Sequence, residues 1–295
     1  MPHISFDGFA LSDTVSELGE GPSYERETDT LWWFDILGKI LHEREIASGR
    51  ERHHSLPVMA SVVARIDAER QLLATEKGIF IRSRRDGSLT PYCELEPGNT
   101  SNRSNDGRVH PSGSLWIGTM GKGAEQGAGA IYHVAREGAV TRLIPDVSIP
   151  NGICFSPDGA TGYFVDTRIN HLMRVPLDAS TGLPTGPATL LVDTSQRQGG
   201  MDGSVCDSDG NIWNARWGAG AVDCYTPAGT YLEGFALPAQ RTTCPVFYGA
   251  ALDQLGVISA WEGLDERQRA EDKEAGKFFC LQVGAKGLPE PSFRI

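Results

Sequence analysis

Four short motifs each place an oxygen-bearing side chain one or two positions before a glycine. They are Glu20 in LGEGP, Asn105 in SNDG, Asn151 in PNG and Asp202 in MDG. Two carboxylates and two amides make a hard-oxygen donor set, which suits Ca²⁺, Mg²⁺ or Mn²⁺ and does not exclude Zn²⁺ or Fe²⁺. A set with few protein ligands leaves coordination positions for water and substrate, as a catalytic metal requires. The motifs therefore predict a site for one divalent metal ion, provided that the fold brings them together.

Each motif alone has a simpler interpretation, because Asn-Gly and Asp-Gly are common turn dipeptides. The prediction of a site depends on all four occupying one position in a repeated unit. The sequence does contain such a repeat, which reads as strand, tight turn and strand. Its second strands are centred near Trp32, Leu72, Trp116, Tyr163, Trp213 and Ile258. The step of roughly 40–50 residues is the period of a propeller blade.

The period favours an all-β, six-bladed β-propeller over a two-sheet sandwich. Residues 1–295 are predicted to form this single domain, in which segments 5–16 and 277–283 complete one blade together and close the ring. Further strands are expected at 78–83, 130–135, 172–176 and 221–226, where apolar and polar residues alternate. Segment 264–275 is charged all round and is expected to be a short surface helix or an ordered loop.

In a propeller the innermost strand of each blade lines the central channel. Residues at the same end of these strands therefore converge on one axis, although they are far apart in the sequence. Counting back roughly 10–13 residues, the length of one hairpin, from each second strand finds the equivalent positions. Repeats one, three, four and five give Glu20, Asn105, Asn151 and Asp202, whereas repeats two and six give apolar residues near Met59-Ala60 and Val246-Phe247. Four oxygen donors in one register favour a metal site over four unrelated turns.

Composition excludes several other classes of protein. The formal net charge of −11 and the lack of a basic stripe argue against a nucleic-acid partner. No run approaches the ~18 apolar residues of a membrane span, and the N-terminus has no secretory pattern, so we expect a cytoplasmic protein without membrane contact. The six cysteines form no C-x-x-C pair and are expected to be buried free thiols.

Other catalytic signatures are missing from the sequence. It contains no G-x-S-x-G nucleophile motif, and the glycine-rich segment 121–129 has the wrong spacing for a phosphate-binding loop. His53, His54 and His110 fall near predicted turns and are interpreted as surface residues. No histidine is therefore expected at the channel position.

Several stretches together resemble the senescence marker protein-30/gluconolactonase family, also called regucalcin-like. They are LGEGP (18–22), NRSNDGRVHPSG (102–113), LWIGTM (115–120), IPNGICFSPDG (149–159) and MDGSVCDSDGNIW (201–213). The resemblance implies a six-bladed propeller that holds one divalent metal in its channel. It also implies hydrolysis of the ring ester of a sugar lactone.

Matched motif by motif, the resemblance implies roles for individual residues. Glu20, Asn151 and Asp202 are the implied metal ligands, and Asp202 is also the implied general base. Arg103 and Asn105 are the implied sugar-binding residues. Asp106 could contact the sugar too, or it could cap a turn.

Two departures from the family pattern concern the substrate. Met201 stands where relatives often have proline, and some relatives carry a sugar-contacting glutamate shortly after Gly-Thr-Met. In this sequence that segment is the glycine-rich stretch 121–129. Lys122 or Glu125 could take the place of the glutamate, or the segment could simply be a mobile loop.

Three functions are therefore compared. The first is metal-dependent hydrolysis of a five- or six-carbon aldonolactone in sugar catabolism, by a monomer or small homo-oligomer. The second is a related hydrolase of the aryl-esterase or phosphotriesterase type, whose sites often add a channel histidine. The third is a non-catalytic calcium-binding regulatory propeller.

Overall fold

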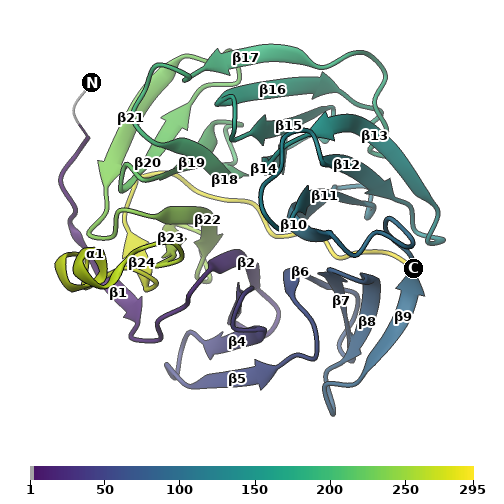
Figure 1. Ribbon diagram of the computed structural model, residues 1–295, viewed down its shortest axis with the longest axis horizontal. Helices are drawn as coiled ribbons and strands as arrows, with labels where there is room; N and C mark the ends of the chain where they lie inside the picture. The colour runs from purple at the N-terminus through teal and green to yellow at the C-terminus, as the bar shows by residue number, and fades with distance from the viewer. Residues whose placement is uncertain (1–2) are drawn as a thin grey trace.

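The computed structural model describes residues 3–295 of the chain. Across these residues the strands form six four-stranded sheets, arranged as blades around a central channel (Figure 1). The prediction of an all-β, six-bladed propeller is confirmed, and six separate sheets exclude the two-sheet sandwich. The predicted domain of residues 1–295 also includes Met1 and Pro2, which lie outside the described residues.

Blades 1 to 5 each consist of four consecutive strands in meander order. Blade 1 contains β2 (Gly19–Glu25), β3 (Thr30–Asp35), β4 (Ile40–Glu45) and β5 (Glu51–Ser55). Blade 2 contains β6 (Ala60–Arg65), β7 (Arg70–Thr75), β8 (Gly78–Ser83) and β9 (Leu89–Cys93). Blade 3 contains β10 (Asn102–Val109), β11 (Leu115–Gly121), β12 (Gly129–Val134) and β13 (Val140–Val147). Blade 4 contains β14 (Pro150–Phe155), β15 (Thr161–Asp166), β16 (His171–Pro176) and β17 (Thr189–Asp193). Blade 5 contains β18 (Gly200–Cys206), β19 (Ile212–Trp217), β20 (Ala221–Tyr225) and β21 (Tyr231–Ala236).

Blade 6 combines the two ends of the chain. It contains β22 (Thr242–Tyr248), β23 (Gln254–Ser259), β24 (Phe278–Leu281) and, as its outermost strand, β1 (Gly8–Ser12). β1 pairs antiparallel with β24, so that Gly8 lies opposite Leu281 and Ala10 opposite Phe279. Backbone hydrogen bonds between the first and last strands therefore hold the ring together at this blade.

One helix, α1 (Glu266–Glu271), lies between β23 and β24 among the described residues. Asp265 caps its first turn by accepting a hydrogen bond from the Gln268 backbone N–H at 2.8 Å. The expectation of a short surface helix within 264–275 is confirmed. Within residues 3–295, no helix has the length and apolar character needed to cross a membrane.

Large apolar side chains from the second strands fill the space between blades. Trp33, Trp116 and Trp213 are fully buried. Trp213 of blade 5 packs edge-on against Phe247 of blade 6, with ring centroids 6.1 Å apart. The expected second strands correspond to β3, β7, β11, β15, β19 and β23. The aromatic and aliphatic residues that revealed the repeat are therefore the ones that pack successive blades together.

The first strand of every blade lies next to the first strands of the neighbouring blades and lines the channel. Each of these strands bulges near its start, where its register to the second strand shifts. The shifts fall between Glu20 and Ser23, Ala60 and Val62, Ser104 and Gly107, Asn151 and Cys154, Met201 and Ser204, and Thr242 and Cys244. A bulge leaves residues unpaired and redirects their side chains. The six bulges therefore form one ring at one end of the channel.

In blade 6 the residue at the bulge differs from the sequence-based alignment. In β6, Ala60 stands directly before the register shift, as Glu20 and Asn151 do in their strands, and Ser61 follows it inside the bulge. The bulge of β22 contains Thr243, instead of the apolar residues near Val246-Phe247. In blade 6, Ile258 lies close to the bulge, since it pairs with Cys244 directly beside it. In blade 5, Trp213 pairs with Val205, farther from its own bulge. A fixed count back from the two residues therefore reaches the bulge in blade 5 but not in blade 6. The ring therefore contains two further hydroxyl side chains, Ser61 and Thr243.

Candidate functional site

The bulges bring the predicted site residues of blades 3 and 4 into direct contact. The Asn105 side-chain amide donates hydrogen bonds to Asn151 Oδ1 at 2.8 Å and to the Pro150 carbonyl at 3.0 Å. The Asn151 amide in turn donates to Thr167 Oγ1 at 2.8 Å, and Thr167 donates to the Met201 carbonyl at 2.6 Å. This chain of hydrogen bonds crosses three blades and fixes the orientation of the Asn151 amide.

Glu20 and Asp202 are buried carboxyl groups with few hydrogen-bond donors around them. Glu20 is 8% exposed and Asp202 is 5% exposed. Glu20 Oε2 accepts a hydrogen bond from the Gly21 backbone N–H at 3.1 Å. Among the described residues, the buried Asp202 Oδ1 has no hydrogen-bond partner. Because a buried polar atom is nearly always satisfied, this oxygen indicates a ligand of positive charge or a donor group in the channel.

The carboxyl groups of blades 1, 3 and 5 lie close enough to influence one another. Burial and then the charge of Asp106 raise the pKa of Glu20 to about 8. Burial raises the pKa of Asp202 well above its ordinary value, and the charges of Glu20 and Asp106 raise it further. Arg103 acts in the opposite direction on both groups. Crowded carboxylates with little compensation favour binding of a cation.

These residues fit a hard divalent cation. No cluster of three or more His, Cys, Asp or Glu side chains suited to a metal occurs within residues 3–295. A cation at the bulges would instead be held by the carboxylates of Glu20 and Asp202 and by the amide oxygen of Asn151, which accepts one hydrogen bond, from Asn105. Such an oxygen set is typical of Ca²⁺, Mg²⁺ and Mn²⁺ sites.

Arg103 lies half-buried at the start of β10, beside this group of carboxylates. Its Nη1 donates to Asn105 Oδ1 at 2.7 Å and to the Ser104 carbonyl at 3.0 Å. Within residues 3–295, its Nε and Nη2 atoms have no hydrogen-bond acceptor. Arg103 can therefore donate to a ligand in the channel mouth while Asn105 holds it in place.

Both carboxylate oxygens of Asp106 accept hydrogen bonds from backbone N–H groups at the bulges. Oδ1 accepts from the Gly107 N–H at 2.8 Å, and Oδ2 accepts from the Ile153 N–H at 2.7 Å. Burial raises its pKa, and these hydrogen bonds act against that increase. Of the two roles left open by the sequence, these contacts agree better with a structural one, in which Asp106 ties blade 3 to blade 4.

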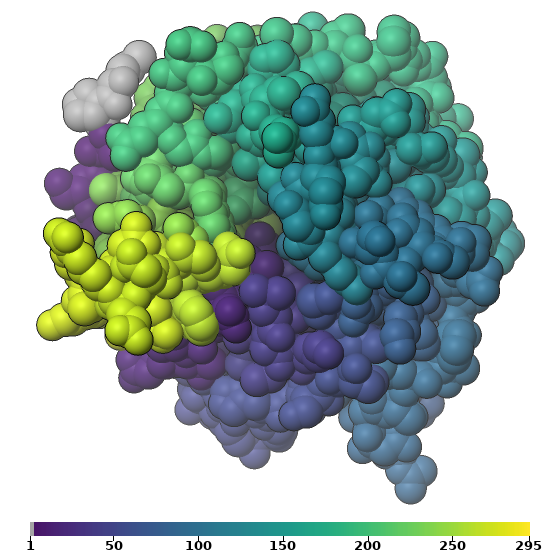
Figure 2. All heavy atoms as spheres, in the orientation of Figure 1, coloured from purple at the N-terminus to yellow at the C-terminus, as the bar shows by residue number. Residues whose placement is uncertain are grey.

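The glycine-rich segment 121–129 connects β11 and β12 and is tied to both neighbouring blades. Lys122 Nζ lies 2.6 Å from Glu76 Oε2 of blade 2, and Arg168 of blade 4 donates to the Ala124 carbonyl at 3.3 Å. Glu125 accepts from the Gly123 N–H at 3.2 Å. Lys122 and Glu125 are therefore both engaged within the protein. Figure 2 shows this teal segment and the yellow segment around α1 on the same face, beside the hollow at the centre of the ring.

His110 is not a surface residue, contrary to the sequence-based interpretation. It is fully buried, and its ring contacts the Gly159 carbonyl at 2.8 Å and Ser112 Oγ at 2.9 Å. The turn that carries it packs against the next blade's turn, which the sequence pattern does not reveal. None of the bulges contains a histidine, since their residues are those of the six register shifts.

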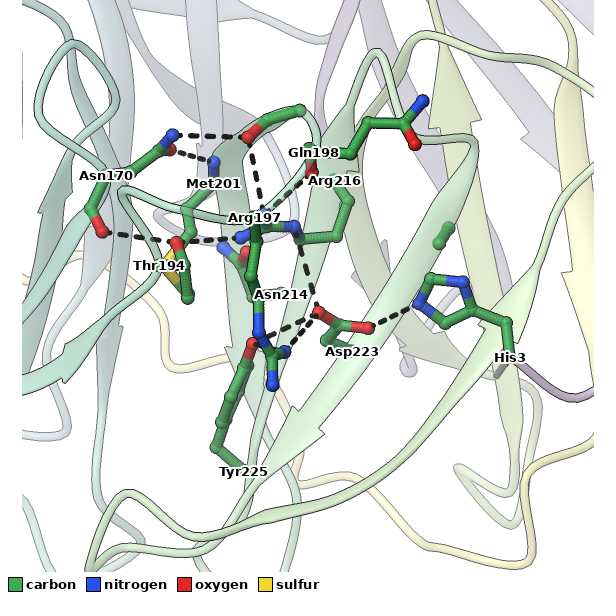
Figure 3. A network of polar contacts seen from close by, with 12 residues as sticks. His3, Asn170, Thr194, Arg197, Gln198, Met201, Asn214, Arg216, Asp223 and Tyr225 are labelled. Carbon is green, nitrogen blue, oxygen red and sulfur yellow. Dashed lines mark hydrogen bonds and ion pairs between the residues drawn. The ribbon is translucent and has the colours of Figure 1, made fainter. Parts of the chain in front are cut away.

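A buried polar network in blade 5 supports the segment that leads to Asp202 (Figure 3). Arg216 lies in the centre of this network. Its Nη1 donates to Thr194 Oγ1 at 3.0 Å, and its Nη2 donates to the Gln198 carbonyl at 3.0 Å. Asn170 holds the same segment from the opposite side, because its Oδ1 accepts a hydrogen bond from the Met201 N–H at 2.8 Å. The backbone before Asp202 is thus fixed from two directions.

Asp223 balances the buried charge of Arg216 in this network (Figure 3). Its Oδ2 lies 3.7 Å from Arg216 Nε and accepts from the Tyr225 hydroxyl at 3.0 Å, while Oδ1 lies 2.8 Å from His3 Nε2. Sequence reasoning missed Arg216 and Asp223, because neither belongs to a motif. The only signal is a charged residue in each of two largely apolar, buried strands, β19 and β20.

Comparison with known proteins agrees with this geometry. A family model described as "SMP-30/Gluconolactonase/LRE-like region" matches residues 18–261. The chain belongs to this family. The match spans all of the motifs that carried the resemblance in the sequence, and that resemblance is confirmed.

Relatives of this family match over nearly their whole length. The chain is 53% identical to a candidate sugar lactone lactonase of Rhizobium meliloti (strain 1021), with 99% of each chain covered. It is 32% identical to a pentonolactonase of Haloferax volcanii, covering 94% of this chain and 95% of the relative. Among solved structures, a calcium-binding protein named regucalcin from Agrobacterium tumefaciens strain C58 superposes with a TM-score of 0.98, at 52% identity and 100% coverage of both chains.

Proposed function

We propose that this protein hydrolyses the ring ester of a sugar lactone to the aldonic acid, with one divalent metal ion held by Glu20, Asn151 and Asp202. The observation that carries the proposal is the buried Asp202 Oδ1, which lacks a partner among the described residues, in a channel where Glu20 and Arg103 lie close enough to shift the pKa of Asp202. Relatives named as a pentonolactonase and a sugar lactone lactonase support the same activity.

Ring opening requires a water molecule to attack the lactone carbonyl carbon. Asp202 accepts a proton from this water as the new carbon–oxygen bond forms, as a carboxylate placed beside an attacking water can. The ring carbon–oxygen bond then breaks, and the ring oxygen takes up the proton held by Asp202 to become a hydroxyl. A divalent ion, when bound, would polarise the carbonyl and lower the pKa of a coordinated water.

Arg103 and Asn105 hold the sugar in this proposal. The free N–H groups of Arg103 donate to substrate oxygens at the channel mouth. Asn105 directs its amide hydrogens at Asn151 and Pro150, so it offers a sugar hydroxyl only its carbonyl oxygen. A small polar mouth of this kind suits a five- or six-carbon aldonolactone from cytoplasmic sugar catabolism, bound by a monomer or small homo-oligomer.

The alternative with specific support is a calcium-binding regulator without catalysis, because one structural relative is named as a calcium-binding protein. An aryl-esterase or phosphotriesterase role has less support, since the bulges contain no histidine. The metal in either case is Ca²⁺, Mg²⁺, Mn²⁺, Zn²⁺ or Fe²⁺.

A pH-indicator assay tests the proposal. Five- and six-carbon aldonolactones and an aryl ester are each incubated with the protein, with and without a chelator, and spontaneous opening is subtracted. We expect chelator-sensitive opening of at least one aldonolactone. The Asp202→Asn and Glu20→Gln variants should each lose at least about 100-fold in rate with an unchanged circular dichroism spectrum. Calcium binding without turnover of any substrate would instead support the regulator.

A further inference from the structure

The C-terminal tail, residues 282–295, crosses the end of the channel that lies opposite the bulges. Figure 1 shows it as a yellow trace that passes across the ring and ends beside blades 2 and 3. The tail contacts the turns that follow the first strands, whereas the bulges lie at the starts of those strands. Its backbone hydrogen bonds reach four blades and join Ser208 to Lys286, Gly287 to Leu252, Phe293 to Arg65, and Arg294 to Gly113.

Glu290 of the tail reaches into the channel and forms an ion pair with Arg108 of β10. The Arg108 side chain is only 11% exposed. A buried guanidinium needs a counter-ion, because an unpaired charge in the protein interior is strongly unfavourable. The tail therefore supplies the anion that permits Arg108 to occupy the channel.

Arg108 also joins the first strands of the two following blades. Its Nε donates to the Ile153 carbonyl in β14 at 3.3 Å, and its Nη2 donates to the Ser204 carbonyl in β18 at 3.1 Å. The planar guanidinium can satisfy these acceptors and Glu290 together because its donors point in fixed, different directions. One side chain thus bridges blades 3, 4 and 5 and the tail.

The two carbonyl groups bound by Arg108 belong to residues that adjoin the candidate site. Ile153 donates its N–H to Asp106, at 2.7 Å. Ser204 follows Asp202 by two positions, and the Asn214 amide bonds both the Asp202 carbonyl at 2.7 Å and Ser204 Oγ at 3.0 Å. Displacing Arg108 would therefore loosen the bulges that present Asn151 and Asp202.

We propose that Glu290 and Arg108 are positioning residues for the cation site: Glu290 holds Arg108 in the channel, and Arg108 fixes the bulges of blades 4 and 5. This inference rests on the proposed function, since it concerns the geometry of the same site. Neither residue touches the substrate. Groups that orient metal ligands from outside the ligand set commonly affect metal affinity or activity by about 10–100-fold.

Mn²⁺ titration calorimetry and steady-state kinetics with the best aldonolactone test the inference on the full-length chain. Glu290→Gln is expected to weaken Mn²⁺ binding and to lower kcat by about tenfold or more, with little change in KM. Glu290→Asp, which keeps the carboxylate, should recover part of both losses. Lys286→Gln removes an exposed charge from the same tail and is the matched control, expected to behave as the unsubstituted protein.

Two outcomes separate this inference from the proposed function. If the unsubstituted protein binds Mn²⁺ and opens lactones, but Glu290→Gln only lowers the melting temperature, the positioning role is wrong. If the unsubstituted protein neither binds Mn²⁺ nor opens lactones, the proposed function itself fails, and this inference fails with it. Should Glu290→Gln not fold, Arg108→Lys replaces it, because lysine keeps the charge but cannot reach all three acceptors. It should weaken Mn²⁺ binding similarly, and unchanged binding would overturn the inference.

Discussion

Glu20 and Asp202 are carboxyl groups that their surroundings drive toward the protonated form. With the pKa of Glu20 raised from 4.5 to about 8, the folded metal-free protein keeps a proton that the unfolded chain releases at lower pH. The free energy of unfolding should therefore fall as pH rises from about 5 to about 8. Melting temperatures measured in chelator across this range should fall with increasing pH, and the Glu20→Gln variant should show a weaker dependence.

The same linkage gives a control for this experiment. A divalent ion competes with protons for these carboxylates, so its affinity should increase with pH and its binding should release protons. Excess Mn²⁺ should therefore flatten the decline in melting temperature. A metal-free protein whose stability increases steadily from pH 5 to 8 would contradict the assignment of Glu20 and Asp202 to one crowded site.

Arg103 offers a second prediction at the scale of the residue. Replacing it by methionine keeps much of its bulk but removes the proposed charge-assisted hydrogen bonds to substrate, each worth about 1.5–3 kcal/mol. We expect kcat/KM for the preferred lactone to fall by about 10–100-fold, mostly through KM, with Mn²⁺ affinity changed much less. Arg103→Lys should retain part of the activity. A loss of metal binding with KM unchanged would instead place Arg103 among the supports of the metal.

At the scale of the element, the network around Asp223 makes a prediction about the segment that leads to β18. Arg216 and Arg197 both face Asp223, but the Arg216 side chain is 2% exposed and that of Arg197 is 43% exposed. Arg216→Met leaves Asp223 without its buried partner and should cost about 3–5 kcal/mol of stability in urea unfolding. The matched change Arg197→Met should cost less than about 1 kcal/mol. Equal effects would show that burial does not decide the strength of this network.

The sequence predicts the strands well because each blade repeats the same pattern of buried second strand and glycine turn. It places Glu20, Asn105, Asn151 and Asp202 correctly at the bulges for the same reason. The count from Leu72 reaches Ala60 beside the bulge of β6, but the count from Ile258 misses Thr243, because Ile258 pairs with Cys244 directly beside the bulge. The sequence could not reveal which residues support the site from outside it, namely Arg108, Arg216 and Glu290. Their contacts join distant segments of the chain without a repeated spacing.

At the scale of the whole molecule, the tail fastens blade 6 to blades 2 and 3. Phe293 is 1% exposed and packs into the apolar cluster between those two blades. Phe293→Ala should therefore lower the free energy of unfolding by about 3–5 kcal/mol. Leu288 lies in the same tail but is 39% exposed, so Leu288→Ala should change stability by less than about 0.5 kcal/mol. Chemical denaturation of both variants measures the difference, and similar values would mean that the tail is not anchored through Phe293.

Ring closure through β1 and β24 also determines when, during synthesis on the ribosome, the protein can mature. β1 is translated first, but its partner strand and Glu290 are translated last. Blades 1 to 5 can form in order as they emerge, because each is built from consecutive strands. The nascent chain nevertheless carries an unpaired first strand and an uncompensated Arg108 until the final residues leave the exit tunnel. The proposed cation site is therefore expected to assemble only after the last residues have been translated, and premature termination near the end of the message should yield a nearly full-length but incompetent protein.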